Sequence, residues 1–550
     1  MTSAPHTASR PPLAARGADL EQLGRETWDV LIVGGGIVGT GALLDAASRG
    51  LRAALIEQDD VAVGTSSRSS RLIHGGLRYL EQFHVGLVRE ALHERARLLE
   101  LAPHLVRLER FLFPLYGTPV VTRSFFQSGM VLYDLLGSAK RGGRHHHLSV
   151  DGALELAPNL RREGLQGAML YADGMEDDAR FTLAVLRTAQ REGGLAVTRV
   201  KAVKALRDGD RVAGATVRDE LTGTEFDVRA AMVLDATGVW GSKPDRPFDS
   251  GKATFNVLPS RGSHILVERD RIPVKTGVTI RVPGKVAFMV PWPRHWVIGT
   301  TDDPFTGPVD RPSASSPEID KILAAVNSAF DVSLTRDDIV GTYAGLRPLI
   351  APSGASSTVK VSREHKVAVE DRGLVRISGG KYTTYRLMAR DAIDAVLGDD
   401  AKERPSATAE MPLVGGAVPR AELDALAQKL AGEAGLDADR ALSLVDRHGT
   451  EATAVLALGR ERDLVRPLVA GHPYIEAEVA WAAEHEIAMS LDDILARRLR
   501  LAMTLRDRGE AIAPRVASIA GEVLGWDADR QAREVAAYVA GAHREFDVPA

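Results

Sequence analysis

The chain has 550 residues and a formal net charge of −4, with 45% hydrophobic and 26% charged residues. This composition is ordinary for a globular protein of several domains, and the small charge argues against nucleic acid as a partner. The absence of cysteine excludes disulfides, Cys-ligated zinc, iron–sulfur clusters and a thiol-linked flavin. No segment has the roughly 18 consecutive apolar residues of a membrane-spanning helix, so any membrane contact would be peripheral.

The beginning of the chain predicts a tail and then a βαβ unit. Residues 1–25 are rich in Ala, Ser and Pro, which favours a disordered tail over a transit peptide. Apolar runs at 28–33 and 51–57 predict two buried strands, and residues 41–50 predict a helix between them. This order and length are typical of a βαβ unit.

A glycine motif joins the first predicted strand to the helix. In "VGGGIVGTG", Gly34, Gly36 and Gly39 have the G-x-G-x-x-G spacing. Glycines let the backbone approach a pyrophosphate, and a helix N-terminus offers N–H donors and the positive end of its dipole. Glu57 ends the second strand about 20 residues later, where an acidic side chain accepts hydrogen bonds from an adenosine ribose. This context predicts a dinucleotide site rather than a turn without a ligand.

The middle of the chain predicts helices and then many short strands. Residues 87–101 and 130–141 have helical patterns, and a Ser-Pro start signal favours a helix over 311–330. From about 195 to 300, short apolar runs between turn signals predict a largely antiparallel sheet. For the histidines of "RHHHL" (144–148) a solvated loop is favoured over a metal site, because neighbours on an extended chain face opposite sides.

The C-terminal part predicts a separate helical domain. Residues 399–410 form a polar linker, and 411–550 are rich in Ala, Leu, Glu and Arg at helical spacing. Within this domain, residues 491–509 predict a basic amphipathic helix. A salt-bridged position on the surface or between domains is favoured for this helix over contact with anionic lipid.

Two further glycine turns indicate a large cofactor. "DATG" (235–238) follows an apolar strand, and "ISGGKYTTYR" (377–386) joins a strand to a helix through Gly-Gly and a lysine. Three such junctions suit FAD better than a nicotinamide carrier, because a larger cofactor needs more backbone contacts.

Seven sequence blocks, taken together, carry a resemblance to a known family. In chain order they are "GGGIVGTG", "TSSRSSRLIHGGLRYLE", "DATGVW", "RGSHILV", "IGTTD", "YAGLRPL" and "GGKYTTYR". With this combination the sequence from about residue 25 to 400 resembles the FAD-dependent glycerol-3-phosphate dehydrogenases. The helical C-terminal part is similar to the cap domain of that family. Arg71 and Arg261 stand where lysine is common in these blocks, and both keep the positive charge.

The resemblance implies an α/β fold with three parts. These are a doubly wound FAD-binding domain of the glutathione-reductase and amino-acid-oxidase type, an antiparallel-sheet substrate domain and an all-α C-terminal cap. The first two would be interleaved over 26–400, with the strand-rich substrate part at roughly 255–350, and the cap would cover 411–550.

The resemblance also implies an activity and its partners. Glycerol 3-phosphate would be oxidised at C2 to dihydroxyacetone phosphate by hydride transfer to flavin N5, and the electrons would pass to a quinone-type acceptor. A cytoplasmic location is expected, and both a peripheral contact with the inner face of the membrane and a homodimer are compatible with the sequence. Whether the flavin is covalently held stays open.

Several cations are predicted to bind the substrate. A buried phosphate carries about two negative charges and therefore needs cations and hydrogen-bond donors. Arg78, Arg347 and Lys381 are the candidate cations, and Tyr79 adds a hydroxyl donor. This density of cations favours a phosphate over a carboxylate substrate.

The predicted catalytic residues are His264, Arg347 and Lys381. The ordinary pKa of histidine suits His264 as base for the C2 hydroxyl proton, with water, His74 or Arg347 as alternatives. Arg347 would stabilise alkoxide charge, and Lys381 would hold negative charge on the reduced ring. The predicted FAD-binding residues, several of them by similarity alone, are Gly34, Gly35, Gly36, Gly39, Glu57, Thr65, Ser66, Ser67, His74, Gly75, Gly76, Gly238, Gly380, Lys381 and Thr383. Gly75 and Gly76 would let the backbone pass under the flavin ring.

Three other functions fit parts of the sequence. An amino-acid or hydroxy-acid oxidase of the same flavin fold would hand electrons to O2. A flavin-binding protein without turnover would keep FAD but show no substrate-dependent reduction. A nicotinamide-dependent dehydrogenase would lack the yellow colour of a flavoprotein.

Overall fold

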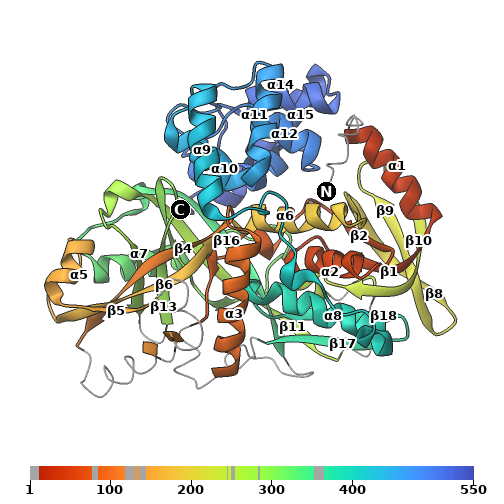
Figure 1. Cartoon of the computed structure of the whole chain (residues 1–550), viewed down its shortest axis with the longest axis horizontal. Helices are drawn as coiled ribbons and strands as arrows, with labels where there is room; N and C mark the ends of the chain where they lie inside the picture. The colour runs from red at the N-terminus through yellow and green to blue at the C-terminus, as the bar shows by residue number, and fades with distance from the viewer. Residues whose placement is uncertain are drawn as a thin grey trace.

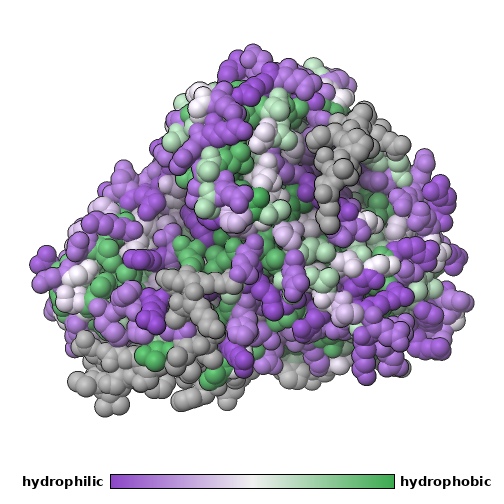
Figure 2. Space-filling model, in the orientation of Figure 1, coloured by the Kyte–Doolittle hydropathy of each residue, from purple (hydrophilic) through white to green (hydrophobic). Residues whose placement is uncertain are grey.

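The computed structural model describes residues 12–76, 85–117, 130–131, 133–134, 144–243, 246–248, 254–282, 285–351 and 364–550. In these residues two β-sheets form the body of the molecule, and a helical domain lies on top of them (Figure 1). Figure 2 shows a mostly hydrophilic face, with smaller hydrophobic patches near the junction of the helical domain with the body.

The first sheet has eight strands within the described ranges. The order is β17-β18-β10-β1-β2-β7, and β8 and β9 continue from β10 as antiparallel strands. Strand β1 pairs in parallel with both β10 and β2, and its near-continuous apolar sequence suits a strand buried on both faces. The strands are β1 Thr27–Val33, β2 Ala53–Glu57, β7 Leu195–Thr198, β8 Val200–Asp208, β9 Arg211–Asp219, β10 Glu225–Asp235, β17 His365–Asp371 and β18 Leu374–Gly379.

Alternation of side chains along β1 gives this sheet two different cores. Val30 and Ile32 pack with the helices α2, α6 and α8, whereas Leu31 and Val33 pack with residues of β8, β9 and α1. The α/β FAD-binding fold predicted from the sequence is confirmed. The helices are α1 Pro12–Arg25, α2 Ile37–Ser48, α6 Asp178–Arg191 and α8 Tyr385–Leu397.

The N-terminal segment is more ordered than its composition indicates. The prediction of a disordered tail over residues 1–25 is wrong for 12–25, which form α1, while 1–11 lie outside the described residues. Leu23 is fully buried, and Arg16 donates to Thr198 O and pairs with Asp219 at 2.6 Å. These long-range contacts hold a helix that its own sequence only weakly favours.

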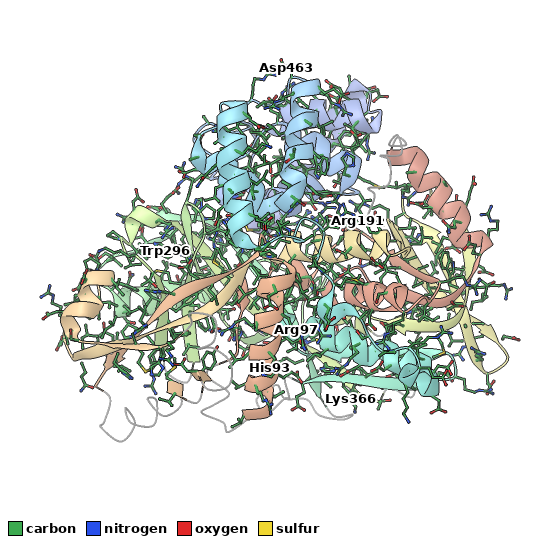
Figure 3. The ribbon with its side chains drawn as sticks, in the orientation of Figure 1. His93, Arg97, Arg191, Trp296, Lys366 and Asp463 are labelled. Atoms are coloured by element: carbon green, nitrogen blue, oxygen red, sulfur yellow. The ribbon has the colours of Figure 1, made fainter. Side chains whose placement is uncertain are left out.

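The second sheet has ten strands in the part of the chain that the structure describes. The order is β15-β11-β14-β13-β12-β4-β6-β3, with β16 on β11 and β5 on β6. Trp296 on β14 is fully buried in its core beneath α7 Ser316–Ala329 (Figure 3). The strands are β3 Leu72–Ile73, β4 Val106–Tyr116, β5 His146–Leu148, β6 Leu165–Glu176, β11 Asn256–Glu268, β12 Gly277–Val282, β13 Lys285–Pro291, β14 His295–Gly299, β15 Asp303–Pro304 and β16 Ile339–Ala351.

Two local predictions around this sheet need correction, and a third lies mostly outside the described residues. The segment 195–300 divides between the two sheets, because β7 and β10 join the first sheet through parallel pairs. The antiparallel β8–β9 hairpin has the same local pattern as the second sheet, so composition cannot separate them. His146–Leu148 form an exposed edge strand rather than a loop. Of the helix predicted over 130–141, only 130–131 and 133–134 are described. The helix α3 Val85–Leu101 comes before β4, and α5 Val150–Leu156 follows β5.

The helical domain packs on one face of the second sheet. Leu266, Val297 and Tyr343 of that sheet share a core with its Ala-rich and Leu-rich helices. Two 3-10 turns fill the predicted linker 399–410. None of the helices in the described ranges has the length and apolarity to span a bilayer. The helices are α9 Arg420–Ala434, α10 Ala438–His448, α11 Ala452–Glu461, α12 Ala477–His485, α13 Leu501–Thr504, α14 Ala513–Leu524 and α15 Ala528–Phe546.

The segment 491–509 is not the single amphipathic helix that its spacing predicts. A π-helical turn covers Asp493–Arg498, and α13 follows after Arg500, whose φ is +60°. Arg497, Arg498 and Arg500 are only 4%, 2% and 2% exposed and form ion pairs with Asp60 and Asp178 of the body. The position between domains is therefore confirmed, and the continuous helix is wrong because the pairing geometry bends the backbone.

Candidate functional site

A cavity of about 420 Å³ lies where the two sheets meet. Its lining includes the carboxyl ends of β1, β10 and β18, at Val33, Asp235 and Gly379, together with His264 of β11 and Arg347 of β16. The carboxyl edge of a parallel sheet is the usual ligand site of open α/β folds. The first sheet therefore contributes one wall and the second sheet contributes the other.

The glycine cradle, residues 34–39, forms one part of this cavity. Gly34 has a φ of +116°, and a Cβ there would lie 2.6 Å from Ala236 O. A Cβ on Gly39 would lie 1.9 Å from Gly34 O, so both positions require glycine. Helix α2 starts directly after Gly36 without a side-chain cap, and the Ser66 hydroxyl accepts from the Ile37 N–H at 2.9 Å. The cradle thus keeps the backbone of the helix N-terminus at the cavity wall, as a pyrophosphate site requires.

Glu57 lies at the end of β2 beside this cradle. Its Oε2 accepts from the Gly35 N–H at 2.6 Å, and its Oε1 accepts from the Asp59 N–H at 2.9 Å. Burial raises the pKa of Glu57 to about 7, against the opposing effect of the Gly35 N–H. Hydrogen bonds from ribose hydroxyls would favour the ionised carboxylate and so offset this burial.

The residues present fit FAD. The cradle leaves no room for side chains, the acidic group stands at the expected strand end, and the cavity continues from Glu57 to His264 and Arg347. Gly34 to Glu57 would hold the pyrophosphate and adenosine, and the lining toward His264 would hold the flavin. When bound, FAD supplies the acceptor for two electrons.

His264 occupies the end of the cavity formed by the second sheet. Its ring is 2% exposed and stacks on Tyr343, its register neighbour, with 4.6 Å between ring centroids. His264 Nε2 lies 2.9 Å from Ser70 Oγ. Burial, followed by the charges of Arg347 and Arg71, lowers the pKa of His264 well below its ordinary value. The imidazole is therefore neutral at physiological pH and able to accept a proton.

Arg347 projects from β16 toward the same end of the cavity. Its Nη2 donates to Thr300 Oγ1 at 2.9 Å, and its Nη1 donates to Thr301 O at 3.2 Å and contacts Asp302 Oδ1 at 3.3 Å. The side chain is 27% exposed. A Cβ on Gly262 would lie 2.6 Å from Arg347 Nη2, so this glycine makes room for the guanidinium. Arg347 is thus a cation of the cavity lining that is held in place by Thr300, Thr301 and Asp302.

Lys381 and Thr383 come from the turn between β18 and α8. Both line the cavity together with Gly380 and His74. Thr383 Oγ1 accepts from the His74 N–H at 3.2 Å, which ties this turn to the segment after Ile73. The turn therefore brings a lysine and two glycines to the cavity, as the Gly-Gly-Lys sequence predicts.

Most sequence-predicted residues meet at this cavity, but some do not. Gly35, Gly39 and Ser67 are not in the lining, and the Ser67 carbonyl accepts from Arg500 at 2.8 Å. A Cβ on Gly75 would lie 2.5 Å from Leu92, so that glycine allows packing on α3. Gly76 is outside the lining, and Arg78 and Tyr79 lie outside the described residues. The predicted residues in the lining are Gly34, Gly36, Glu57, Thr65, Ser66, His74, Gly238, His264, Arg347, Gly380, Lys381 and Thr383.

Some lining residues carry no sequence signal of their own. Ser69 and Ser70 lie in the serine-rich block, whose spacing does not show which hydroxyl faces the histidine. Lys201, Lys243 and Arg246 also line the cavity, although they belong to β8 and the segment after β10. Only the three-dimensional arrangement brings these cations to the cavity.

Comparisons with known proteins agree with this geometry. Residues 29–386 match the family model described as FAD dependent oxidoreductase, and 406–531 match the C-terminal domain of alpha-glycerophosphate oxidase. A glycerol-3-phosphate dehydrogenase of Mycobacterium leprae is 45% identical over 533 residues, covering 96% of this chain and 90% of the relative. The chain belongs to the FAD-dependent glycerol-3-phosphate dehydrogenase family. The human mitochondrial member of the family is 38% identical over 523 residues, covering 91% of this chain and 71% of its own length.

A solved structure of the same family extends the likeness to the fold. The glycerol-3-phosphate dehydrogenase of Bacillus halodurans, complexed with FAD, superposes with a TM-score of 0.79 at 28% identity. The match covers 96% of this chain and 97% of the other, so the helical domain is included. The chain is thus an FAD-dependent oxidoreductase whose fold is similar to that of the Bacillus halodurans enzyme over nearly its whole length.

Proposed function

We propose that the protein oxidises glycerol 3-phosphate at C2 to dihydroxyacetone phosphate, with hydride transfer to flavin N5. The observation that carries the proposal is the pairing of a buried neutral base, His264, with the fixed cation Arg347 at one end of the cavity. The names of the relatives, as glycerol-3-phosphate dehydrogenases, support the same substrate.

In this proposal Ser70 takes the proton of the C2 hydroxyl, and His264 accepts the proton that Ser70 gives up. In the tautomer with its proton on Nδ1, His264 Nε2 accepts from the Ser70 hydroxyl, which is 2.9 Å away. Ser70 then passes its proton to the imidazole and takes the substrate proton, while the C2–H bond breaks and its electron pair leaves with the hydride. One C=O bond forms, and one proton and one hydride leave the substrate.

Arg347 and Lys381 supply positive charge to the reaction. The Arg347 guanidinium is held by Thr300 and Thr301, so it needs little reorganisation when alkoxide charge develops. A substrate phosphate near Arg347 would offset the charge that lowers the pKa of His264, making the imidazole a stronger base once substrate is bound. Arg78 and Tyr79 remain proposed phosphate ligands.

An anaerobic absorbance titration tests this function. The FAD-loaded protein is titrated with glycerol 3-phosphate, and we expect bleaching of the flavin band at stoichiometric substrate. Glycerol and inorganic phosphate together are the matched control, because they offer the same groups without the ester. Bleaching by an amino acid or hydroxy acid but not by glycerol 3-phosphate would replace the proposal with an oxidase. A flavin band that no substrate bleaches would indicate a binding protein without turnover.

We propose further that a quinone-type acceptor reoxidises the flavin and that the protein works in the cytoplasm, in peripheral contact with the inner face of the membrane. The motif resemblance supports both points. Reoxidation of the substrate-reduced protein by a short-chain quinone should exceed reoxidation by air-saturated buffer, measured in one stopped-flow instrument. Flotation with anionic vesicles tests the membrane contact, and sedimentation in the same buffer tests for a homodimer.

A further inference from the structure

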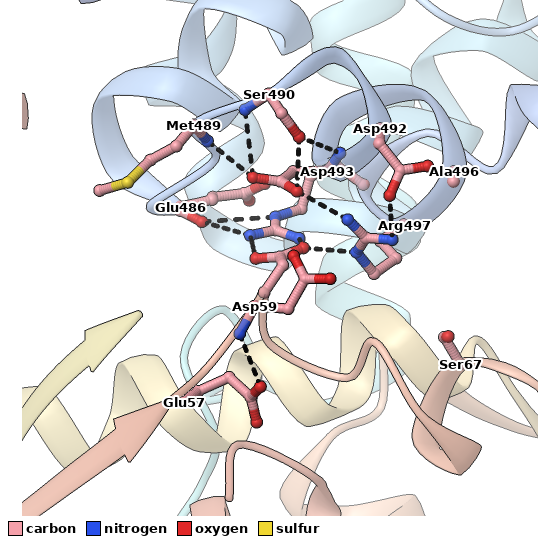
Figure 4. Close-up of polar contacts among 12 residues, drawn as sticks. Glu57, Asp59, Ser67, Glu486, Met489, Ser490, Asp492, Asp493, Ala496 and Arg497 are labelled. Carbon is pink, nitrogen blue, oxygen red and sulfur yellow. Dashed lines mark hydrogen bonds and ion pairs between the residues drawn. The ribbon is translucent and has the colours of Figure 1, made fainter. Parts of the chain in front are cut away.

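The pocket segment, residues 57–71, lines much of the cavity, yet the helical domain supplies many of its contacts. Asp60, 1% exposed, accepts from Arg498 at 2.6 and 2.8 Å and pairs with Arg497 at 2.5 Å. Arg68 pairs with Glu545 at 2.6 Å. Figure 4 shows Arg497 with Asp492 and Asp493, close to Asp59 and Glu57 at the start of this segment. The helical domain is therefore bonded directly to a wall of the FAD site.

Arg500 contacts the pocket segment close to Ser70. Its Nη2 donates to Ser67 O at 2.8 Å and to Asp178 Oδ1 at 2.6 Å. Asp178 is fully buried at the first turn of α6, and Arg500 is 2% exposed. A guanidinium between a buried carboxylate and a backbone carbonyl holds both acceptors at fixed positions.

Asp178 transmits this position to the catalytic side chains. Its second oxygen, Oδ2, accepts from the Ser69 N–H at 2.8 Å, and Ser69 O accepts from the Tyr343 hydroxyl at 2.8 Å. Both backbone polar groups of Ser69, its N–H and its C=O, are therefore hydrogen-bonded, and Ser70 Oγ lies 2.9 Å from His264 Nε2. Tyr343 also stacks on the His264 ring. A continuous chain of bonds thus runs from Arg500 to His264.

Two arginines, Arg500 in the chain of bonds and Arg71 next to it in the pocket segment, have a strained backbone conformation. Arg500 and Arg71 have φ values of +60° and +58°, in the left-handed region that long side chains seldom adopt. Such conformations persist where the surrounding contacts over-determine them, and they gather at functional sites. Arg71 is fully buried over Trp292, with 3.6 Å from its guanidinium carbon to the ring centroid.

We propose that Arg500 is a positioning residue for the reaction: through Asp178 and Ser67 O it sets the orientation of Ser69 and Ser70, and thereby of the Ser70–His264 pair. The helical domain is then part of the catalytic geometry and not only a cover. The role of the pair in proton transfer rests on the proposed function, whereas the control of the pocket segment by Arg500 does not.

The test compares Arg500→Gln and Arg500→Lys in the FAD-loaded, full-length protein. We expect flavin reduction by saturating glycerol 3-phosphate to slow about 100-fold in Arg500→Gln, because small displacements of reacting groups cost rates of this order. FAD content and the half-saturating substrate concentration should change less than about threefold. Arg500→Lys keeps the charge but lacks the planar guanidinium. Its reduction rate should therefore be about tenfold higher than that of Arg500→Gln.

Arg180→Gln is the matched control for a loss of domain docking. Arg180 lies on α6 close to Asp178, but it joins the two domains through Glu486, at 2.7 and 2.8 Å. We expect this variant to lose at least as much thermal stability as Arg500→Gln while keeping the reduction rate within about twofold, since the Asp178–Ser69 bond is intact.

Visible circular dichroism of the bound flavin separates this proposal from the proposed function, because it needs no substrate. A changed flavin spectrum in Arg500→Gln but not in Arg180→Gln supports the positioning role, even if glycerol 3-phosphate fails to reduce the wild-type protein. Equal spectra and equal rates in Arg500→Gln and wild type would overturn it, as would an equal rate loss in Arg180→Gln. Should Arg500→Gln not fold, Asp178→Asn carries the same comparison, because it removes the charged acceptor and keeps the volume.

Discussion

The two ends of the cavity are built in different ways. The glycine cradle and Glu57 come from one continuous stretch, residues 27–57, in which one β-strand, one helix and a second β-strand are neighbours in sequence and in space. The reaction end brings Ser70, His264 and Arg347 together from segments far apart in the chain. The glycine cradle and Glu57 are therefore placed together mainly by local structure, whereas the reaction end depends on contacts between distant segments.

Because of this difference, substitutions at the two ends of the cavity should change different measured quantities. Changes in the cradle should weaken FAD binding with little influence on chemistry in the protein that still holds FAD. Changes at the reaction end should slow flavin reduction while FAD stays bound.

The largest effect is expected at Arg347. Arg347→Ala should slow flavin reduction by about 1,000-fold, because a preorganised cation for developing charge is lost, while FAD content stays near that of the wild type. The reduction rate of Arg347→Lys should lie between those of Arg347→Ala and the wild type, since lysine keeps the charge but lacks the planar guanidinium with its fixed donors. Stopped-flow reduction and the ratio of flavin to protein absorbance give both quantities. A parallel loss of FAD and rate would contradict the separation of the two ends.

A substitution at Gly39 tests whether the glycine cradle binds FAD. A Cβ at Gly39 would lie 1.9 Å from Gly34 O, so Gly39→Ala must push the cradle backbone apart. We expect a cost of about 2 kcal/mol, or roughly thirtyfold in FAD affinity, measured by titration of the apoprotein. Gly17→Ala is the control, because nothing lies within 4 Å of a Cβ there. Unchanged FAD affinity in Gly39→Ala would mean that the cradle is not the pyrophosphate site.

The pH dependence of FAD binding should follow Glu57. Its pKa of about 7 in the free protein means that the carboxyl is mostly protonated at pH 6 and mostly ionised at pH 8. Ribose hydroxyls donate to the ionised form, so binding below pH 7 releases a proton and becomes weaker as the pH falls. Affinity at pH 6 should be about tenfold lower than at pH 8, and Glu57→Gln should flatten this profile. A slope that survives in Glu57→Gln would have to come from another group.

The smallest effect is expected far from the cavity, at Arg16. Arg16→Gln removes a pair with Asp219, which keeps hydrogen bonds from Leu221 N–H and from the Thr222 hydroxyl. Because the carboxylate is not left unpaired, we expect a loss of about 1 kcal/mol in the free energy of unfolding. Denaturant titration of the holoprotein measures this free energy of unfolding. FAD affinity and reduction rate should stay unchanged, and a change in either would show that α1 influences the site.

The sequence predicts the nucleotide part of the site well because its signals are local. The G-x-G-x-x-G spacing and an acidic strand end lie within one βαβ unit, and the structure has them where the pattern indicates. His264 and Arg347 could be chosen only through the resemblance, since nothing in an isolated β-strand reveals which partner it faces. The bond between Ser70 and His264 was beyond prediction for the same reason. The contacts of Arg500 were still harder to predict, because a basic sequence with helical spacing does not show that its arginines are buried.

The contact between Arg500 and Ser67 also has a consequence for the newly made chain. The two residues are 433 positions apart. At ordinary rates of translation the ribosome needs roughly 20 to 90 seconds to make the intervening residues. During that interval the first βαβ unit is already outside the ribosome. The pocket segment next to Ser70 still lacks its hydrogen bond from Arg500, which has not yet been made. A nascent chain can therefore complete its nucleotide cradle well before it can complete the geometry for catalysis.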